Sequence, residues 1–237
     1  MKANVRSVQM FLRQIRQDSM LTLFCFLPLV IAAVFRFGIP FLETQLCALL
    51  NKPSVLREYY LLFDLFLAVF APYFLVFLSS MVMLAEIDEH VSAYLAVTPI
   101  RKQGYLVSRF LFPALFAALV SAALMACCSL THWTIGNIAL LCLLSVLLCI
   151  PVAMMIVVFS HNRVEGMALA KLAGLLLFGL PVPFFLTNET QYLFAWLPSF
   201  WIAKVFMGPA YWAAIPAIVL SAVWILLQYK RFERKLL

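Results

Sequence analysis

Charge is scarce in this chain: only 11% of its 237 residues are charged and 66% are hydrophobic. Soluble domains have about 25% charged and about 45–50% apolar residues, and a soluble fold of this length could not cover so much apolar surface. Lipid is therefore expected to solvate much of the chain. The net charge of +7 does not indicate a nucleic-acid partner, because the basic residues lie beside apolar segments, where anionic lipid and topology account for them.

Glycine is scarce as well, with seven residues, so close helix packing at GxxxG motifs is not expected to organise the fold. The alternating pattern typical of membrane barrels is also missing. Instead the sequence contains apolar runs that approach or exceed the roughly 17–25 residues with which a helix crosses a bilayer. It thus predicts an all-α polytopic membrane protein with six transmembrane helices, in which residues 1–237 form a single domain. The predicted spans are residues 20–35, 60–84, 106–128, 138–159, 167–186 and 210–227.

Lysine and arginine set the expected orientation. With the N-terminus inside, all but four of the 17 basic residues lie on the inner side, as the positive-inside rule requires. The four outside are Arg36, Lys52, Arg57 and Lys204. No small-residue cleavage site follows the first apolar run, so a removed signal peptide is not expected. We predict a bacterial cell-membrane protein with both termini in the cytoplasm.

Three segments outside the spans carry structure of their own. Residues 3–17 are predicted to form an amphipathic helix at the inner membrane interface. Its apolar stripe consists of Val5, Val8, Leu12 and Ile15. Residues 37–58 are expected to form an external loop on the membrane surface. Residues 192–206 are aromatic and apolar but short, which predicts an external or re-entrant helical segment before the last span.

Residues 86–98 are predicted to form a short cytoplasmic helix between the second and third spans. Acidic residues come first, where the positive end of the helix dipole favours negative charge, and apolar side chains then share one face. The residue before a proline avoids the α region, so Thr98 ends the helix. A segment that only joined two spans would need no apolar face, so we interpret this helix as a docking element. The residues assigned to docking are Glu86, Asp88, Glu89, Val91, Tyr94, Leu95, Thr98 and Pro99.

The acidic residues, the short helix and the run Leu95-x-x-Thr98-Pro99-Ile100 with Tyr105 resemble the coupling region of type-2 ABC exporter permeases. Those permeases also have six spans, an interfacial N-terminal helix and a short helical insertion before the last span. The resemblance in layout therefore covers nearly the whole chain. Residues 162–171 are similar to the family's short loop into the fifth span. The small size of the chain resembles that of drug and lantibiotic exporter permeases that pair two short subunits.

The resemblance implies the transmembrane subunit of an exporter. Two permease subunits, identical or related, would enclose a path for an amphipathic drug, peptide or lipid-like molecule. Separate ABC ATPase subunits would bind beneath them at the coupling helix and would hold the ATP and Mg²⁺. This chain has no Gly-x-x-x-x-Gly-Lys-Ser/Thr phosphate loop, so we expect a transport subunit without its own ATPase site. Its expected partners are the ATPase subunits, a second permease and membrane lipid.

Residues suited to catalysis or metal binding are few. The three histidines fall in separate polar loops without carboxylate or cysteine neighbours at ligand spacing, and the six cysteines form no CxxC motif. We therefore expect no catalytic residue, no metal and no cofactor in this chain. Asp64 is the one acid within a predicted span and is a candidate intramembrane polar site. Its place near the external end also suits a carboxylate that faces the interface or a neighbouring polar group.

Two functions from other classes stay open on the residues alone. A membrane-embedded enzyme would need several acids, histidines or metal ligands that converge within the spans, and Asp64 stands alone there. A non-catalytic assembly or immunity protein would share the same composition. A neighbouring ATPase gene would favour export over both.

Overall fold

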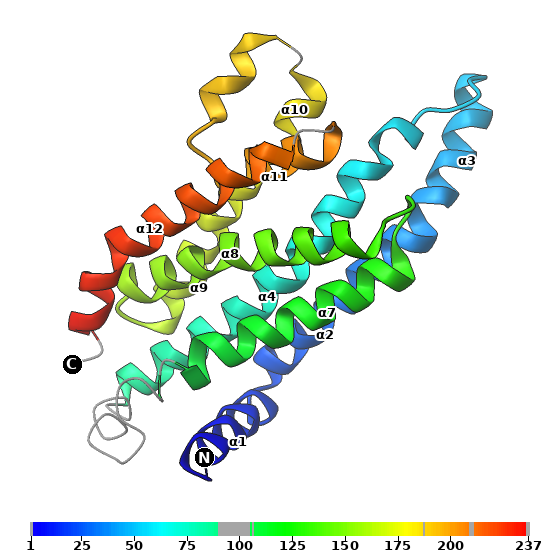
Figure 1. The fold of residues 1–237 in the computed structure, drawn as a ribbon. Helices are drawn as coiled ribbons and strands as arrows, with labels where there is room; N and C mark the ends of the chain where they lie inside the picture. Colours follow the sequence, from blue (N-terminus) through cyan, green and yellow to red (C-terminus); the bar gives the residue numbers. More distant parts are fainter. Residues whose placement is uncertain (1, 90–104, 106, 187, 209–210, 236–237) are drawn as a thin grey trace.

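The computed structural model describes residues 2–89, 105, 107–186, 188–208 and 211–235, and every regular element in these ranges is a helix (Figure 1). Among the described residues, five helical stretches are long and apolar enough to cross a membrane. They are Ser19–Leu50, Arg57–Asp88, Ser108–Cys128, Ile135–Phe159 and Tyr211–Lys235. The predicted all-α polytopic class is therefore confirmed, whereas the predicted count of six spans is not.

Side-chain caps fix where several helices begin. Asp18 accepts hydrogen bonds from the backbone N–H groups of Met20 at 3.0 Å and Leu21 at 3.3 Å, and Asn162 accepts one from Glu165 at 2.9 Å, which satisfies donors that a helix start leaves free. The helices are α1 (Lys2–Gln17), α2 (Ser19–Ala33), α3 (Ile39–Leu50), α4 (Tyr60–Asp88), α7 (Phe112–Cys128), α8 (Ile135–Phe159), α9 (Arg163–Ala173), α10 (Val182–Phe185), α11 (Pro198–Met207) and α12 (Ala214–Lys235).

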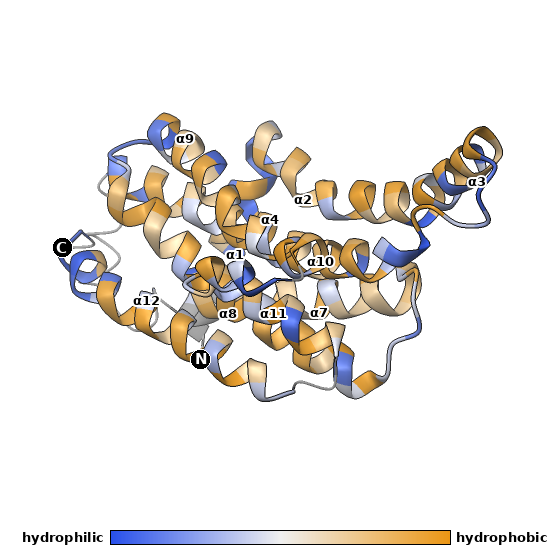
Figure 2. Ribbon diagram, turned by 90° about the horizontal axis from the view of Figure 1, so that it is seen from above, coloured by the Kyte–Doolittle hydropathy of each residue, from blue (hydrophilic) through white to orange (hydrophobic). Residues whose placement is uncertain are grey.

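The first span differs from its predicted end. Residues 37–58 were expected to form an external loop, but α2 continues through a π-helical turn at Val34–Gly38 into α3. The π-helical turn directly precedes α3. Pro40 therefore lies in the first turn of α3, a position that proline tolerates. Asn51, with φ of 48°, ends the helix in the left-handed region. As a result α3 projects beyond the rest of the bundle (Figure 2).

The predicted fifth span, residues 167–186, is not one continuous helix. It consists of the end of α9, a 3-10 helix at Gly174–Gly179 and the short α10. Glycine and proline are poor formers of helix interiors, and they cluster here at Gly174, Gly179, Pro181 and Pro183. A Cβ atom on Gly179 would collide with Ser199 and Phe200. The break therefore also lets the chain pass close to α11.

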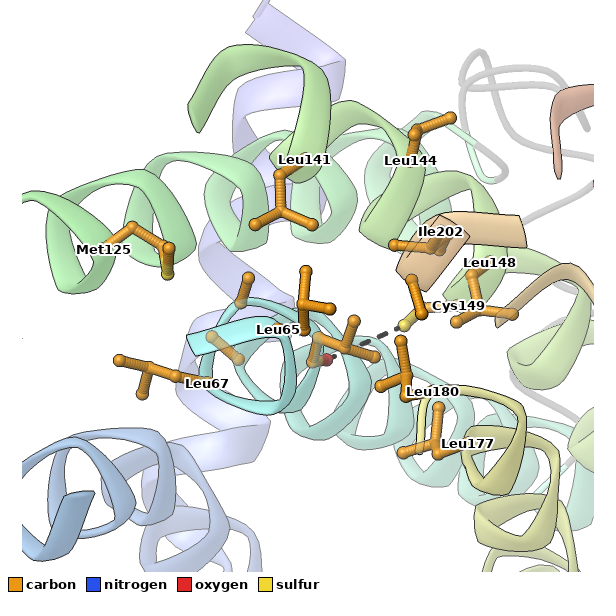
Figure 3. Packing of buried hydrophobic residues seen from close by; sticks show 14 of the residues in the cluster. Leu65, Leu67, Met125, Leu141, Leu144, Leu148, Cys149, Leu177, Leu180 and Ile202 are labelled. Atoms are coloured by element: carbon orange, nitrogen blue, oxygen red, sulfur yellow. Dashed lines mark hydrogen bonds between the residues drawn. The ribbon is translucent and has the colours of Figure 1, made fainter. Parts of the chain in front are cut away.

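The hydrophobic core surrounds α4, which contacts α2, α7, α8 and α9. This helix is apolar on all sides, as expected of a helix at the centre of a bundle. Leu65 of α4, Met125 of α7 and Leu148 of α8 are buried together in one cluster (Figure 3). Further along α4, Leu78 and Met81 lie in a second cluster with Phe11 of α1. The core thus extends along α4 to the end of the bundle where α1 lies.

Both described ends of the chain lie on one side of the bundle. Figure 1 shows α1 and the last turns of α12 at the same end, with α10 at the opposite end. Five crossings alone would leave the two ends on opposite sides of a membrane. The broken stretch from α9 to α10 supplies the additional passage between the two ends of the bundle. That the α1 end faces the cytoplasm stays a prediction.

Candidate functional site

The acidic residues assigned to the coupling helix belong to the preceding helix. Glu86 and Asp88 lie in the last turns of α4, and Glu89 is its C-cap residue. α4 is therefore longer than the predicted span 60–84, because its helix continues through the acidic residues instead of ending before them. The other predicted coupling residues lie outside the described residues: Val91, Tyr94, Leu95, Thr98 and Pro99.

A buried ion pair joins the two chain segments that flank residues 90–104. Arg109 donates from Nε to Glu86 Oε2 at 3.0 Å and from Nη2 to Glu86 Oε1. Both side chains have no exposed surface. Burying two charges is costly, and the bidentate geometry together with further hydrogen bonds offsets that cost. The end of α4 and the start of the next span are thus held together at this point.

Tyr105 completes the surroundings of the Glu86 carboxylate. Its hydroxyl donates to Glu86 Oε2 at 3.0 Å, and its ring lies 5.7 Å from the Arg109 guanidinium carbon. Burial, followed by the negative charge of Glu86, raises the pKa of the Tyr105 phenol well above its usual range. The phenol therefore remains a proton donor to the carboxylate over the whole physiological pH range.

The same arginine binds the N-terminal helix. Arg109 Nη1 donates to the carbonyl oxygen of Ser7 at 3.0 Å, the hydroxyls of Ser7 and Ser108 lie 2.9 Å apart, and the Phe11 ring is 5.2 Å from the guanidinium. We call Ser7, Glu86, Tyr105, Ser108 and Arg109 the basal cluster. It connects α1, the end of α4 and the start of the third span through buried polar contacts.

The face by which α1 contacts the protein coincides only in part with the predicted apolar stripe, of which Ile15 packs against the buried cluster that contains Phe11. Ser7 and Phe11 are buried, whereas Leu12 is 50% exposed. The outward-facing Leu12 suits a helix that lies against lipid. Arg109 adds a further requirement to the inward face, because its guanidinium contacts the Ser7 carbonyl oxygen and the Phe11 ring. An amphipathic pattern alone could not reveal this second requirement.

A π-helical turn at Val107–Leu111 presents Arg109 to this cluster. Such turns open the regular hydrogen-bond ladder and are frequent at functional sites. Here the Arg109 carbonyl oxygen accepts a hydrogen bond from the hydroxyl of Ser79 on α4. Arg109 is therefore fixed to α4 by its backbone as well as by its side chain.

Asp64 lies at the opposite end of α4 and has only 1% of its surface exposed. It accepts hydrogen bonds from the backbone N–H groups of Leu130 at 2.8 Å and Thr131 at 2.9 Å, and from Trp133 Nε1 at 2.9 Å. These donors belong to the connection between α7 and α8. The contacts describe a carboxylate that organises a turn, and they agree with the reading in which Asp64 faces neighbouring polar groups.

An aromatic groove of about 370 Å³ lies between α2, α4 and α9. The ring of Phe24 is 6.2 Å from Phe74 and 5.2 Å from Phe77, and the Tyr73 hydroxyl donates to the carbonyl oxygen of Ala170 at 2.5 Å. Lys171 places one cation in an otherwise apolar lining. The groove is lined by Met20, Phe24, Tyr73, Phe74, Phe77, Met167, Ala170 and Lys171. We call this the aromatic groove.

The described residues contain no group of three histidine, cysteine, aspartate or glutamate side chains that could hold a metal ion. All six cysteines are free. His161 instead pairs with Glu165 across one helical turn, with Nδ1 3.1 Å from Oε2. Hydrogen bonds from His161 hold the pKa of the Glu165 carboxyl below its usual range.

The sequence matches a family model described as "Fluoroquinolones export permease protein Rv2686c-like" over residues 11–229. It is also 24% identical over 172 residues to the fluoroquinolones export permease protein Rv2686c of Mycobacterium tuberculosis strain ATCC 25618 / H37Rv, and equally to MT2760 of strain CDC 1551 / Oshkosh. Each match covers 67% of this chain and 66% of the relative, slightly less than two thirds of the relative's length. No solved structure matches.

Proposed function

Because this chain belongs to the Rv2686c-like family of fluoroquinolone export permeases, and is thus the membrane subunit of an ABC exporter, we propose that it exports amphipathic aromatic compounds under the power of separate ATPase subunits. Membership of a permease family indicates a transport subunit rather than a catalytic enzyme. Its place is the cell membrane, in keeping with the apolar helices. The ATPase subunits, the nature of the substrate and the inward position of both termini belong to this proposal.

The basal cluster is the observation that carries the proposed mechanism. A docking segment transmits force only if its two flanks move with the helices to which they connect. Glu86 and Arg109 hold these flanks together without any exposed surface, and Arg109 adds α1 through the Ser7 carbonyl. A force applied to residues 90–104 would therefore reach α4, the third span and α1 together. Rigid-body movement of packed helices is a common form of switching between states.

The aromatic groove suggests how a substrate is received. Flat aromatic molecules stack on rings such as Phe24 and Phe74, and Lys171 supplies a counter-charge for an acidic group on the same molecule. The groove lies between α4, which the basal cluster anchors, and α9. Movement of the anchored α4 would change the width of the groove, and this links ATP-driven motion to substrate release.

The proposed function also implies which subunits form the complete exporter. The ATPase subunits would bind ATP and Mg²⁺, and a second permease subunit, identical or related, would complete the path. The predicted docking residues Val91, Tyr94, Leu95, Thr98 and Pro99 remain the proposed contact with the ATPase. Asp88 and Glu89 border that contact, whereas Glu86 supports it from within the protein.

Transport in inside-out vesicles tests the proposal. Vesicles that hold this chain with its ATPase subunit should accumulate a fluoroquinolone when ATP and Mg²⁺ are added. Glu86→Gln should lower ATP-driven accumulation, because it removes the charge that Arg109 binds. Glu58→Gln, an exposed acid at the opposite end of α4, is the matched control. Accumulation that needs neither ATP nor a catalytically active ATPase subunit would refute the proposal.

A further inference from the structure

A second groove, of about 790 Å³, lies where the ends of α1 and α4 meet the beginnings of α2 and α9. Unlike the aromatic groove, it is bordered by charges of both signs. Arg13 and Arg163 are positive, and Asp18 and Glu89 are negative. We call it the charged groove. Asp18 and Arg163 are bonded to each other, with Arg163 Nη1 2.9 Å from Asp18 Oδ2. No hydrogen bond to Arg13 or Glu89 side-chain atoms occurs within the described part of the chain.

Gln14 and Arg163 line the charged groove, and each has one buried polar atom, Gln14 Oε1 and Arg163 Nε, without a hydrogen-bond partner among the described residues. One is an acceptor and the other a donor. An unpartnered buried polar atom is costly, so a side-chain rotation that brings either atom to the groove surface would be stabilised by a molecule that supplies the missing bond. A ligand that satisfied both atoms would have to carry a donor and an acceptor within one small group.

The charged groove contains both positive and negative side chains, and this restricts which ligands could bind there. A simple anion would be attracted by Arg13 and Arg163 but repelled by Asp18 and Glu89. A zwitterion with a phosphate and a primary ammonium group meets all four charges, because its phosphate accepts from the arginines and its N–H groups donate to Glu89 and to Gln14 Oε1. Phosphoethanolamine has this chemistry. Phosphocholine has the same charges but no N–H donor.

The position of the groove favours a lipid over a protein as the carrier of that group. α1 is an amphipathic helix whose exposed Met10 and Leu12 suit the headgroup boundary. The charged groove opens beside α1 at the ends of the membrane-crossing helices α2 and α4, at the depth where lipid headgroups lie.

We infer that the charged groove binds the phosphoethanolamine headgroup of a membrane phospholipid, with Arg13 and Arg163 at the phosphate and Gln14 and Glu89 at the ammonium group. The headgroup would join α1 to the ends of α4 and α9 beside the basal cluster. The inference rests on the proposed function in one respect only, namely that the end of the bundle with α1 faces the inner leaflet. The binding itself can be measured without transport.

Native mass spectrometry of the purified full chain tests the inference. The chain would be delipidated and then incubated with defined amounts of phosphatidylethanolamine, phosphatidylcholine or phosphatidylglycerol. Phosphatidylethanolamine should be retained about tenfold better than either of the other two, since a hydrogen bond to a charged group is worth roughly that factor. Equal retention of phosphatidylglycerol would show general attraction to anionic lipid and would overturn the assignment.

Three variants make the test specific to the groove. Arg13→Gln and Gln14→Leu should each remove most of the preference for phosphatidylethanolamine, and neither substitution removes a member of the Arg163–Asp18 ion pair. Arg16→Gln is the matched control, because Arg16 lies on the same helix but does not line the groove. Unchanged preference in both groove variants would refute the site.

Two further outcomes separate the sources of the headgroup. Soluble glycerophosphoethanolamine that binds as well as the intact lipid would identify a site for a free metabolite and would refute the lipid assignment. Protection of Arg13 from arginine-reactive phenylglyoxal by an ATPase subunit, but not by phosphatidylethanolamine, would identify a protein-docking groove instead. Normal lipid preference in a chain that fails to transport would leave this inference standing and refute only the proposed function.

Discussion

Arg109 Nη1 donates a hydrogen bond to the carbonyl oxygen of Ser7 at 3.0 Å, and thereby connects two residues that lie 102 positions apart in the chain. The other nitrogens of the guanidinium bind Glu86. One buried side chain therefore links α1 to both flanks of the proposed coupling segment. A motion of that segment relative to α1 would have to break a buried, charge-assisted hydrogen bond.

The first prediction concerns the stability of this link. Arg109→Leu leaves the buried Glu86 carboxylate without its charged partner, with the Tyr105 hydroxyl still donating to it, which should lower the free energy of unfolding by about 3–5 kcal/mol. Glu86→Met combined with Arg109→Leu removes both charges and should recover much of that loss, because an apolar pair of similar volume is tolerated where a lone charge is not. Thermal unfolding in detergent would rank the variants. A double variant no more stable than Arg109→Leu would contradict this account.

The second prediction concerns alkaline pH. Because the pKa of the Tyr105 phenol is raised in the folded protein, its contribution to stability is fully present below the unfolded-state pKa of about 10 and is lost as the pH rises through the folded-state pKa. Tyr105→Phe lacks this contribution. Below about pH 9 it should be less stable than the parent by about 1.5–3 kcal/mol, the worth of a hydrogen bond to a charged group.

The pH dependence of that difference provides the check. The gap in unfolding midpoint between the parent chain and Tyr105→Phe should be constant from about pH 7 to about pH 9 and should shrink above about pH 10. Comparing the two proteins cancels the other groups that titrate in this range. A gap that widened with rising pH would mean that the phenol is ionised in the folded state.

The sequence predicted the helical class and most of the apolar runs, because hydrophobicity over a long window is a strong local signal. It did not predict the continuity of α2 with α3. The predicted first span ends at residue 35, whereas the helix continues through a π-helical turn that includes Arg36 and Gly38. The break in the predicted span at residues 167–186 has a local signal in the sequence, because Pro181 and Pro183 are poor formers of a helix interior.

The basal cluster was missed for a different reason. In the sequence, Arg109 is one of the inner basic residues that set the orientation, and Glu86 is one of the acids of the predicted cytoplasmic helix. Their pairing across 23 positions is a tertiary contact, which no periodicity reveals. A usable signal existed: two charges of opposite sign stand at the facing ends of consecutive apolar runs, where an unpaired charge would be costly. The sequence allowed the prediction that Asp64 faces a polar neighbour, but it did not identify the groups that donate hydrogen bonds to its carboxylate.

The third prediction concerns the aromatic groove. Phe74→Ala removes a ring that lies 6.2 Å from Phe24 and borders the groove. Loss of one aromatic contact, worth about 0.5–1.5 kcal/mol, should raise the substrate concentration for half-maximal transport by about two- to tenfold. Phe116→Ala, on the half-exposed face of α7 away from the groove, should not change it. Equal effects of both variants on transport would exclude the groove as the receiving site.

The last prediction tests the proposed coupling segment. If Val91, Tyr94 and Leu95 insert into an ATPase groove, truncation of such anchors should cost about 2 kcal/mol or more in association. Tyr94→Ala combined with Leu95→Ala should therefore weaken ATPase binding or uncouple ATP hydrolysis from transport. Membrane insertion should survive, since both residues lie between the predicted spans 60–84 and 106–128.

Two comparisons decide what the Tyr94 and Leu95 variant means. Lys52→Ala with Glu58→Ala alters charge at the opposite end of the bundle and should leave coupling intact. Asp88→Ala with Glu89→Ala alters the acids at the end of α4 without disturbing the buried Glu86, and should lower coupling only if these acids pair with basic residues of the ATPase. Transport and ATP turnover would be measured for all three in reconstituted vesicles. Normal transport with normal ATP turnover in the Tyr94 and Leu95 variant would show that this segment is only a connection, and the basal cluster would then hold together two spans rather than transmit force.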